Sequence, residues 1–261
     1  MGNEPGMLSQ LTLFAVPNLP VIQPGDDLGA LIVASLTEAD APLLEGDVVV
    51  VAQKVVSKVE NRLARLDLVQ PGREALELAQ RIGKDPRLVQ LVLDESREVV
   101  RTGPGLLIVE QRNGLICANA GIDRSNIQQG KEGEWVALLP LDPDLSARRL
   151  QDRLVELTGK RLAVIITDTH GRPWRDGASG IAIGVAGIAP LQDRRGEHDL
   201  FGYQLQHTIV GLADQVASAA SLLQGQAAEG QPVVVVRGLT YEAREASADE
   251  ILRPRERDLF R

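Results

Sequence analysis

The sequence predicts a mixed α/β fold, in which helices pack on sheets with both parallel and antiparallel strands. Short runs of apolar, mostly β-branched residues, such as 48–52, 162–166 and 233–236, are typical of strands buried on both faces. Segments with apolar residues at helical spacing alternate with these runs. Asn113-Gly114 between two apolar runs is a strong signal for a tight β-hairpin, so we expect antiparallel pairing as well.

The elements follow one another with recognisable boundaries. Pro17 and Pro20 withhold backbone donors and end the first strand, Asp27 is placed to cap the first helix, and Gly159 is placed to end a later one. The expected strands are residues 12–16, 48–52, 106–110, 115–118, 135–139, 162–166 and 233–236. The expected helices are residues 28–36, 74–82, 86–93, 143–158 and 208–223. Without an internal repeat or a low-complexity linker, residues 1–261 are expected to form one domain, with 241–261 as a peripheral tail, helical or frayed.

Composition excludes several classes of function. A net charge of −8, without a basic cluster, argues against nucleic acid as a partner. The amino terminus lacks the pattern of a signal peptide, and no apolar run approaches the length of a membrane span, so no membrane association is expected. Cys117 is the only cysteine, which rules out an intrachain disulfide and a cysteine-based zinc cage. A cytoplasmic protein is the simplest expectation.

The stretch 162–175 is the first candidate for chemistry. Its apolar run is followed at once by Thr167, Asp168 and Thr169, whose oxygens suit Mg²⁺ or Mn²⁺, and then by Arg172 and Arg175, whose guanidinium groups suit phosphate or carboxylate. The pattern indicates a site for a metal ion and a phosphate. An ordinary exit from a strand into a loop, in which these groups satisfy the backbone, explains the same residues.

A second carboxylate, Asp123, also follows an expected strand. Two aspartates at strand ends can share one divalent cation together with a substrate phosphate, although their separation in sequence does not establish that they meet. The chain has neither a GxxxxGK[ST] nor a GxGxxG fingerprint between a strand and a helix. A bound nucleotide would therefore be held in some other way.

Seven strings of this sequence resemble, in order, the coenzyme F420-0:L-glutamate ligase family, the γ-glutamyl ligases of deazaflavin coenzyme biosynthesis. The resemblance covers about residues 14–240. The strings are VPNLPVIQPGDDL, GDVVVVAQKVVSKVENR, GKDPRLVQLVLDESREVVR, NAGIDRSN, TGKRLAVIITDTHGRPWR, AIGVAGIAPLQDRRGEHDL and PVVVVRGL.

The resemblance implies a fold and a reaction. GTP would phosphorylate the terminal carboxylate of the lactyl-phosphate side chain of F420-0, and the amine of L-glutamate would attack the acyl phosphate; a second glutamate can follow. Two divalent ions, Mg²⁺ or Mn²⁺, are implied, with K⁺ as a further cation, and so are the F420 ligase-like fold and an interwoven homodimer. The flavin-linked reductase domain of two-domain bacterial relatives is missing from this sequence, so its activity is not expected.

Matched position by position, the resemblance also assigns site residues. Asp123, Asp168 and Lys58 are implied for catalysis. The implied nucleotide contacts are Leu19, Pro20, Val21, Ile22, Gln53, Lys54, Lys58, Asn126, Gln224 and Gly225. The implied metal ligands are Asp123, Asp168, Thr169 and Gln226.

This sequence departs from the family pattern at several positions. His170 replaces a usually aromatic residue, and Ala178 and Gly180 replace polar residues, which bears on acceptor specificity more than on metal binding. The remaining departures are His198, His207 and Gln215.

Two other hypotheses stay open from the sequence. One is an amide ligase of the same fold that uses another phosphorylated carboxylate or another amino acid. The other is a protein that binds a nucleotide or a deazaflavin without catalysis.

Overall fold

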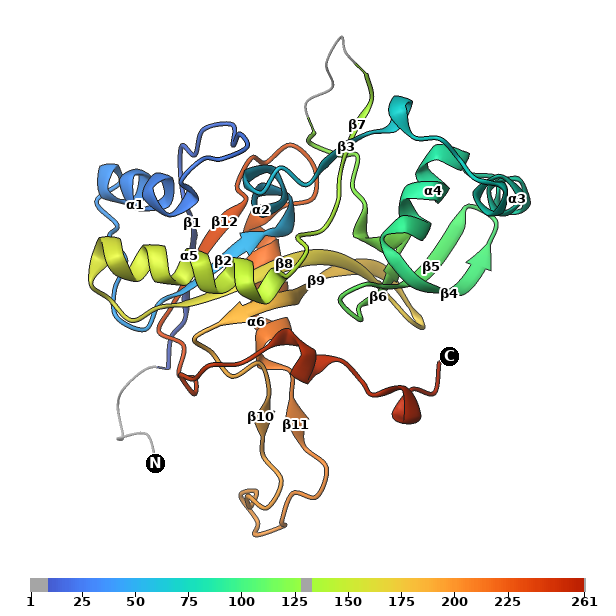
Figure 1. Ribbon diagram of the computed structural model, residues 1–261. Coiled ribbons are helices and arrows are strands. Elements are labelled where there is room, and N and C mark those ends of the chain that lie inside the picture. Colours follow the sequence, from blue (N-terminus) through green and yellow to red (C-terminus); the bar gives the residue numbers. More distant parts are fainter. Residues whose placement is uncertain (1–8, 128–132, 261) are drawn as a thin grey trace.

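The computed structural model describes residues 9–127 and 133–260, and it confirms a mixed α/β architecture (Figure 1). A five-stranded sheet has the order β1-β12-β2-β8-β9, in which only β2 and β8 are parallel neighbours. Its strands are β1 (Thr12–Ala15), β12 (Val233–Arg237), β2 (Val48–Ala52), β8 (Ala163–Arg172) and β9 (Arg175–Ala186).

Helices cover both faces of this sheet. On one face α1 (Leu28–Glu38) and α5 (Pro143–Thr158) pack against Val49 and Val51. On the other face α6 (Leu212–Gln224) packs against Val48 and Val50. Alternate valines of one strand therefore enter two different cores, which explains why the run is apolar at every position.

Three predicted helix ends are confirmed by their capping residues. The Asp27 carboxylate accepts from Ala30 N at 3.0 Å, and the Asp142 carboxylate accepts from Leu145 N at 2.9 Å, so each satisfies a free N–H of the first turn. Gly159 adopts a left-handed conformation with φ of 66° and ends α5.

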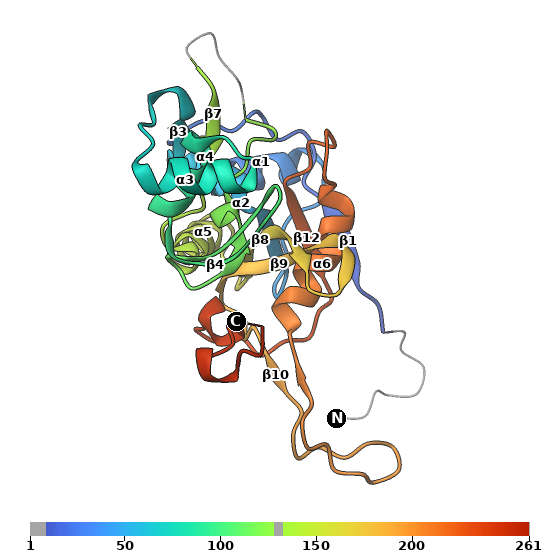
Figure 2. The ribbon, with the colours of Figure 1, turned by 90° about the vertical axis from the view of Figure 1, so that its right-hand side faces the viewer.

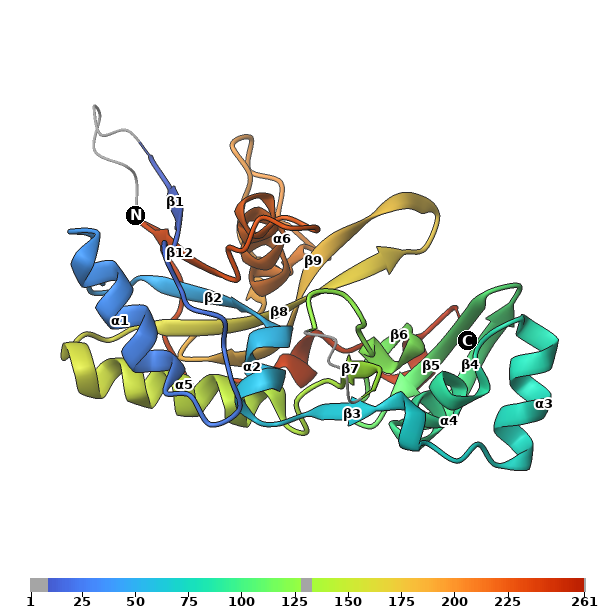
Figure 3. The same cartoon turned by 90° about the horizontal axis from the view of Figure 1, so that it is seen from above.

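A second lobe has its own apolar core, separate from the main sheet. It consists of α3 (Arg73–Ile82) and α4 (Pro86–Asp94) packed on a sheet of β4 (Ser96–Gly103), β5 (Leu106–Gln111) and β6 (Ile116–Ala118). The predicted hairpin at Asn113-Gly114 joins β5 to β6. The ribbon of β3 (Leu63–Arg65) and β7 (Trp135–Ala137) lies between the lobes, next to α2 (Gln53–Val59) (Figure 3).

The prediction that the strand 162–166 ends before Thr167 is wrong. β8 continues to Arg172 because its antiparallel pairing with β9 supplies hydrogen-bond partners beyond the point where β2 ends. A β-bulge between Ile166 and Thr167 marks the change. The candidate side chains after Ile166 are thus mounted on a hairpin rather than on a loop.

The helix predicted at 208–223 also begins later than expected, at Leu212. Residues Ile209–Val210 instead form β11, which pairs with β10 (Gln192–Asp193) at the base of a protruding arm (Figure 2). The charge run 193–199 lies in this arm and is exposed, as a solvated loop would be.

Residues 241–260 contain two short 3₁₀ turns, Ala248–Ile251 and Arg255–Arg257, instead of the expected helix or frayed end. Ala248 is buried, and the segment crosses from the main sheet to the second lobe (Figures 1 and 2). Arg261 lies outside the described residues. Within those residues, no helix has both the length and the apolar character needed to cross a bilayer.

Candidate active site

The candidate site lies at one edge of the main sheet, and the strand directions explain its position. β1, β2 and β8 run the same way, so their carboxyl ends share an edge, and β12 starts from that edge. Loops at the carboxyl ends of strands in α/β sheets commonly form binding sites. A cavity of about 1440 Å³ opens here.

Every site residue implied by the resemblance lines this one cavity. The structure therefore brings together side chains from five separate segments of the chain. They are Leu19, Pro20, Val21, Ile22, Gln53, Lys54, Lys58, Asp123, Asn126, Asp168, Thr169, Gln224, Gly225 and Gln226.

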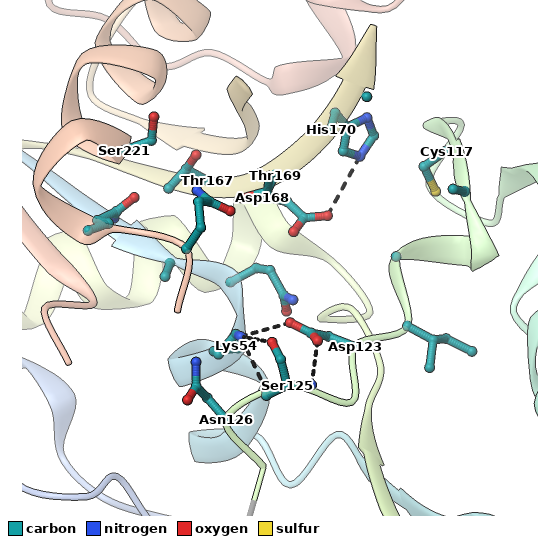
Figure 4. A pocket seen from close by; sticks show the side chains of 18 of the residues that line it. Lys54, Cys117, Asp123, Ser125, Asn126, Thr167, Asp168, Thr169, His170 and Ser221 are labelled. Carbon is teal, nitrogen blue, oxygen red and sulfur yellow. Dashed lines mark hydrogen bonds and ion pairs between the residues drawn. The ribbon is translucent and has the colours of Figure 1, made fainter. Parts of the chain in front are cut away.

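An ion pair joins two of these segments. Lys54, directly after β2, places its Nζ 2.8 Å from Asp123 Oδ2, and it also donates to the Ser125 hydroxyl at 2.8 Å (Figure 4). Burial alone would raise the pKa of Asp123, but donation from Lys54 and from Ser125 N outweighs burial and lowers that pKa. Asp123 is therefore held as a carboxylate.

Lys58 follows Lys54 by one turn of α2, so both ammonium groups lie on the same side of that helix. Burial lowers the pKa of Lys58, and the nearby charge of Lys54 lowers it further. An anion in the cavity would relieve this repulsion, because it would attract both cations.

Asp168 faces the same space as Asp123, from the opposite wall (Figure 4). Its neighbour Thr167 lies at the bulge, and the buried Thr167 hydroxyl has no hydrogen-bond partner among residues 9–127 and 133–260. Buried His170 Nε2 likewise has no hydrogen-bond partner within those residues, and it lies 3.6 Å from Asp168 Oδ2. Buried polar atoms are rarely left unsatisfied, so these atoms point to a ligand or water here.

The chemistry of the lining residues fits a hard divalent cation. Asp123 and Asp168 offer carboxylates, Thr169 a hydroxyl and Gln226 an amide oxygen, and Mg²⁺ commonly takes one or two carboxylates together with phosphate oxygens. Among residues 9–127 and 133–260, no group of three or more His, Cys, Asp or Glu side chains is arranged to hold a metal. A metal would therefore use hydroxyl, amide or substrate oxygens as well.

The implied nucleotide segments also contact one another. Asn126 Nδ2 donates to Ala227 O at 2.8 Å, which fixes the turn after α6 against the segment that carries Asp123. Gln224 is the last residue of α6 and donates to Pro232 O at 3.2 Å. Gly225 has φ of 70°, a conformation that favours glycine.

Sequence reasoning missed the far wall of the cavity. This wall comes from the second lobe and from the carboxyl terminus, and it includes Arg101, Ile108, Leu259 and Phe260. Cys117 belongs to the same wall, where burial and then the charge of Asp168 raise the pKa of its thiol to about 12. Ile108, Leu259 and Phe260 lie in segments without a recognisable motif, and the sequence assigned no site role to Arg101, at the end of one family-like string, or to Cys117.

The structure explains one departure from the family pattern. A Cβ on Gly180 would lie 2.7 Å from Ala217 O, so the close packing of α6 requires glycine there. Ala178 is exposed on β9. His198 and His207 lie on the protruding arm, and Gln215 is exposed on α6, all outside the cavity lining.

Comparisons with known proteins identify the family of this chain. The model of the F420-0:Gamma-glutamyl ligase family matches residues 17–238. A coenzyme F420:L-glutamate ligase of Methanopyrus kandleri is 48% identical over 98% of this chain and 100% of its own length. Ligases of the same name from Methanothermobacter thermautotrophicus and Archaeoglobus fulgidus are each 46% identical, over 96% and 97% of this chain and 99% and 97% of their own lengths. The chain belongs to the F420-0:gamma-glutamyl ligase family, a family of ligase enzymes.

Proposed function

We propose that this protein joins L-glutamate to coenzyme F420-0 in a GTP- and divalent-metal-dependent reaction. The names of its relatives support the two substrates. The observation that carries the proposal is the single cavity in which Asp123, Asp168, Lys54 and Lys58 meet the turn at 224–226. This cavity combines carboxylates for cations with ammonium groups for phosphates.

The first step activates the acceptor. An oxygen of its terminal carboxylate attacks the γ-phosphorus of GTP, and the bond from that phosphorus to the leaving GDP oxygen breaks. Such a transfer needs positioning and charge neutralisation more than a protein nucleophile. Lys54 and Lys58 supply positive charge, while the Thr167 hydroxyl, which no group in the described part of the chain engages, supplies a donor near Asp168.

The second step forms the amide. The amine of L-glutamate, having released its ammonium proton to solvent, attacks the acyl carbon. The bond from that carbon to the phosphate oxygen breaks, and the nitrogen gives a second proton to the departing phosphate or to solvent. A divalent ion, when bound, would polarise phosphoryl oxygens. Asp123, Asp168, Thr169 and Gln226 are the residues that would hold two such ions, and K⁺ is proposed as an additional cation.

We further propose that the protein acts as a homodimer, as the resemblance implies. The arm between β10 and β11 extends away from the main sheet and carries Leu200 and Phe201, which are 97% and 96% exposed (Figure 2). Tyr203 is also exposed. Apolar side chains on a projecting hairpin are typical of an interface. The double substitution Leu200→Asp with Phe201→Asp should therefore shift the protein from dimer to monomer, as measured by sedimentation velocity.

The deciding experiment for the activity is incubation with F420-0, GTP, L-glutamate and Mn²⁺, followed by mass analysis. We expect one or more glutamyl mass increments, each with one GDP, and no GDP when either glutamate or F420-0 is left out. A product with another amine from a panel would instead support the related amide ligase. Nucleotide protection against thermal unfolding without GDP formation would support a protein that only binds.

A further inference from the structure

Trp174 occupies an unusual position at the tip of the β8–β9 hairpin. It follows Pro173 and has φ of 62°, which is the third position of a turn where glycine or asparagine is normally found. Among the described residues, the other non-glycine positions with positive φ are mostly Asn or Asp. Trp174 is also 87% exposed, so its indole stabilises neither the turn nor the core.

The carboxyl-terminal segment brings a second ring to this tip. The rings of Phe260 and Trp174 have centroids 6.2 Å apart and are tilted by 53°. The contacts that hold the segment on β4 include an Arg255–Glu98 ion pair at 3.0 Å and donation from Arg101 Nη2 to Phe260 O at 3.4 Å. The segment therefore places Phe260 beside the tip of a hairpin that starts in the other lobe.

Both rings line the same cavity as the two carboxylates of the candidate site. Aromatic residues make up only 3% of this chain, so a pair of them at one cavity wall is a notable use of a scarce residue type. Exposed aromatic faces bind flat ring systems by stacking. The cavity thus has a polar, charged region and an aromatic region.

The distance between these regions suits an elongated ligand. At about 3.3 Å per residue, the four residues from Asp168 to Arg172 place the hairpin tip roughly 13 Å beyond Asp168 along β8. The implied nucleotide segments, 19–22 and 224–226, come from other loops of the cavity. The aromatic region is therefore available to the second large substrate.

We propose that Trp174 and Phe260 form the site that stacks the deazaflavin ring of the acceptor, while its carboxylate reaches the region of Asp123 and Asp168. This inference rests on the proposed function, since the acceptor is F420-0. It makes Trp174 and the carboxyl-terminal segment determinants of acceptor specificity. Neither ring takes part in the phosphoryl or acyl transfer.

The test uses two ligands, so that the ring site and the ligase activity are measured separately. The first is a deazaflavin with its sugar-alcohol chain but without phosphate or carboxylate, and its fluorescence is titrated with the full-length protein. Trp174→Ala and Phe260→Ala should each weaken binding, the former by about tenfold, and Trp174→Phe should restore most of the affinity. Trp135→Phe is the matched control, because Trp135 lies outside the cavity lining.

The second ligand is F420-0 in the ligase assay, where Trp174→Ala should raise the KM for F420-0 by a similar factor and leave the KM for GTP unchanged. Wild-type affinity of both alanine variants for the deazaflavin would overturn the inference, as would a wild-type protein that does not bind it. Tryptophan-dependent binding without any glutamyl product would support the ring site and refute the proposed function. If Trp174→Ala lowered the melting temperature, Phe260→Ala would provide the same test.

Discussion

The two ends of strand β2 carry charged groups in very different surroundings. Before the strand, Asp47 is 1% exposed, and its carboxylate accepts two hydrogen bonds from Arg237, at 2.9 and 2.7 Å, and one from Leu44 N. After the strand, Lys54 reaches across to Asp123 at the wall of a large cavity. Groups of the protein itself donate hydrogen bonds to both oxygens of Asp47, whereas Asp123 lies beside space that a ligand can fill.

This difference separates structural charge from functional charge. Both oxygens of the buried Asp47 carboxylate already accept hydrogen bonds, so this carboxylate has little capacity for another ligand, and its removal leaves Arg237 without its charged partner. Asp123 and Asp168 face an open cavity, beside the Thr167 hydroxyl, which has no hydrogen-bond partner among the residues that the structure describes. Substitutions at the two ends should therefore affect different properties: stability at Asp47, and turnover at the cavity.

The largest effect is expected from Asp168→Asn. Turnover of GTP in the presence of F420-0, glutamate and Mn²⁺ should fall by roughly a thousandfold or more, because a charge needed in the transition state is lost. The melting temperature should change little, since the carboxylate faces the cavity rather than a core. Asp176→Asn, on the same hairpin but outside the cavity lining, is the matched control and should keep full activity. Unfolding of Asp168→Asn with retained specific activity would show that the residue is structural.

Asp47→Asn should produce the opposite result. The free energy of unfolding should fall by about 1.5–3 kcal/mol, because Arg237, which is 29% exposed, would lose charge-assisted hydrogen bonds to its buried partner. The activity of the remaining folded protein should be unchanged, since Asp47 lies outside the cavity lining. Urea unfolding measures the first quantity, and GDP release per folded molecule measures the second. The exposed pair Asp193–Arg195 provides the control, and Asp193→Asn should leave stability nearly unchanged.

The sequence predicts those features of the fold and of the site that depend on neighbouring residues. The apolar run at 48–52 gave β2 with its observed bounds, and Asp27, Asp142 and Gly159 gave helix boundaries through capping. Strand-end polarity pointed to Asp123 and Asp168, and both line the cavity. These features follow from periodicity and backbone chemistry, which neighbouring residues determine.

The remaining features depend on pairing between distant segments. The continuation of β8 past Ile166 required knowledge of its hairpin partner, and the saturation of Asp47 required Arg237, which lies 190 residues away. Phe260 reaches the cavity through contacts on β4, a strand whose side chains are exposed or only partly buried. No local pattern distinguishes such residues from ordinary surface positions.

The Lys54–Asp123 pair allows a smaller test, based on pH. The pKa of folded Asp123 is lowered, so its ionised form stabilises the native state above its ordinary pKa, near 4, and this contribution is lost as the pH falls through the lowered value. The stability difference between wild type and Asp123→Asn should therefore be constant near pH 7 and shrink below about pH 4. Urea unfolding over this range measures the difference. A difference independent of pH would mean that Asp123 and Lys54 are not coupled.

The smallest expected effect concerns Cys117, which tests how close the charge of Asp168 lies to the cavity wall. With its pKa raised to about 12 by burial and by that charge, the thiol should be almost entirely protonated at pH 8 and should react slowly with iodoacetamide. Asp168→Asn removes the negative charge, so the labelling rate should rise modestly in that variant, and Asp176→Asn should leave it unchanged. Mass spectrometry of timed samples gives both rates. Equal labelling rates in wild type and Asp168→Asn would show that burial alone protects the thiol. The charge of Asp168 would then have no effect on Cys117 at the cavity wall.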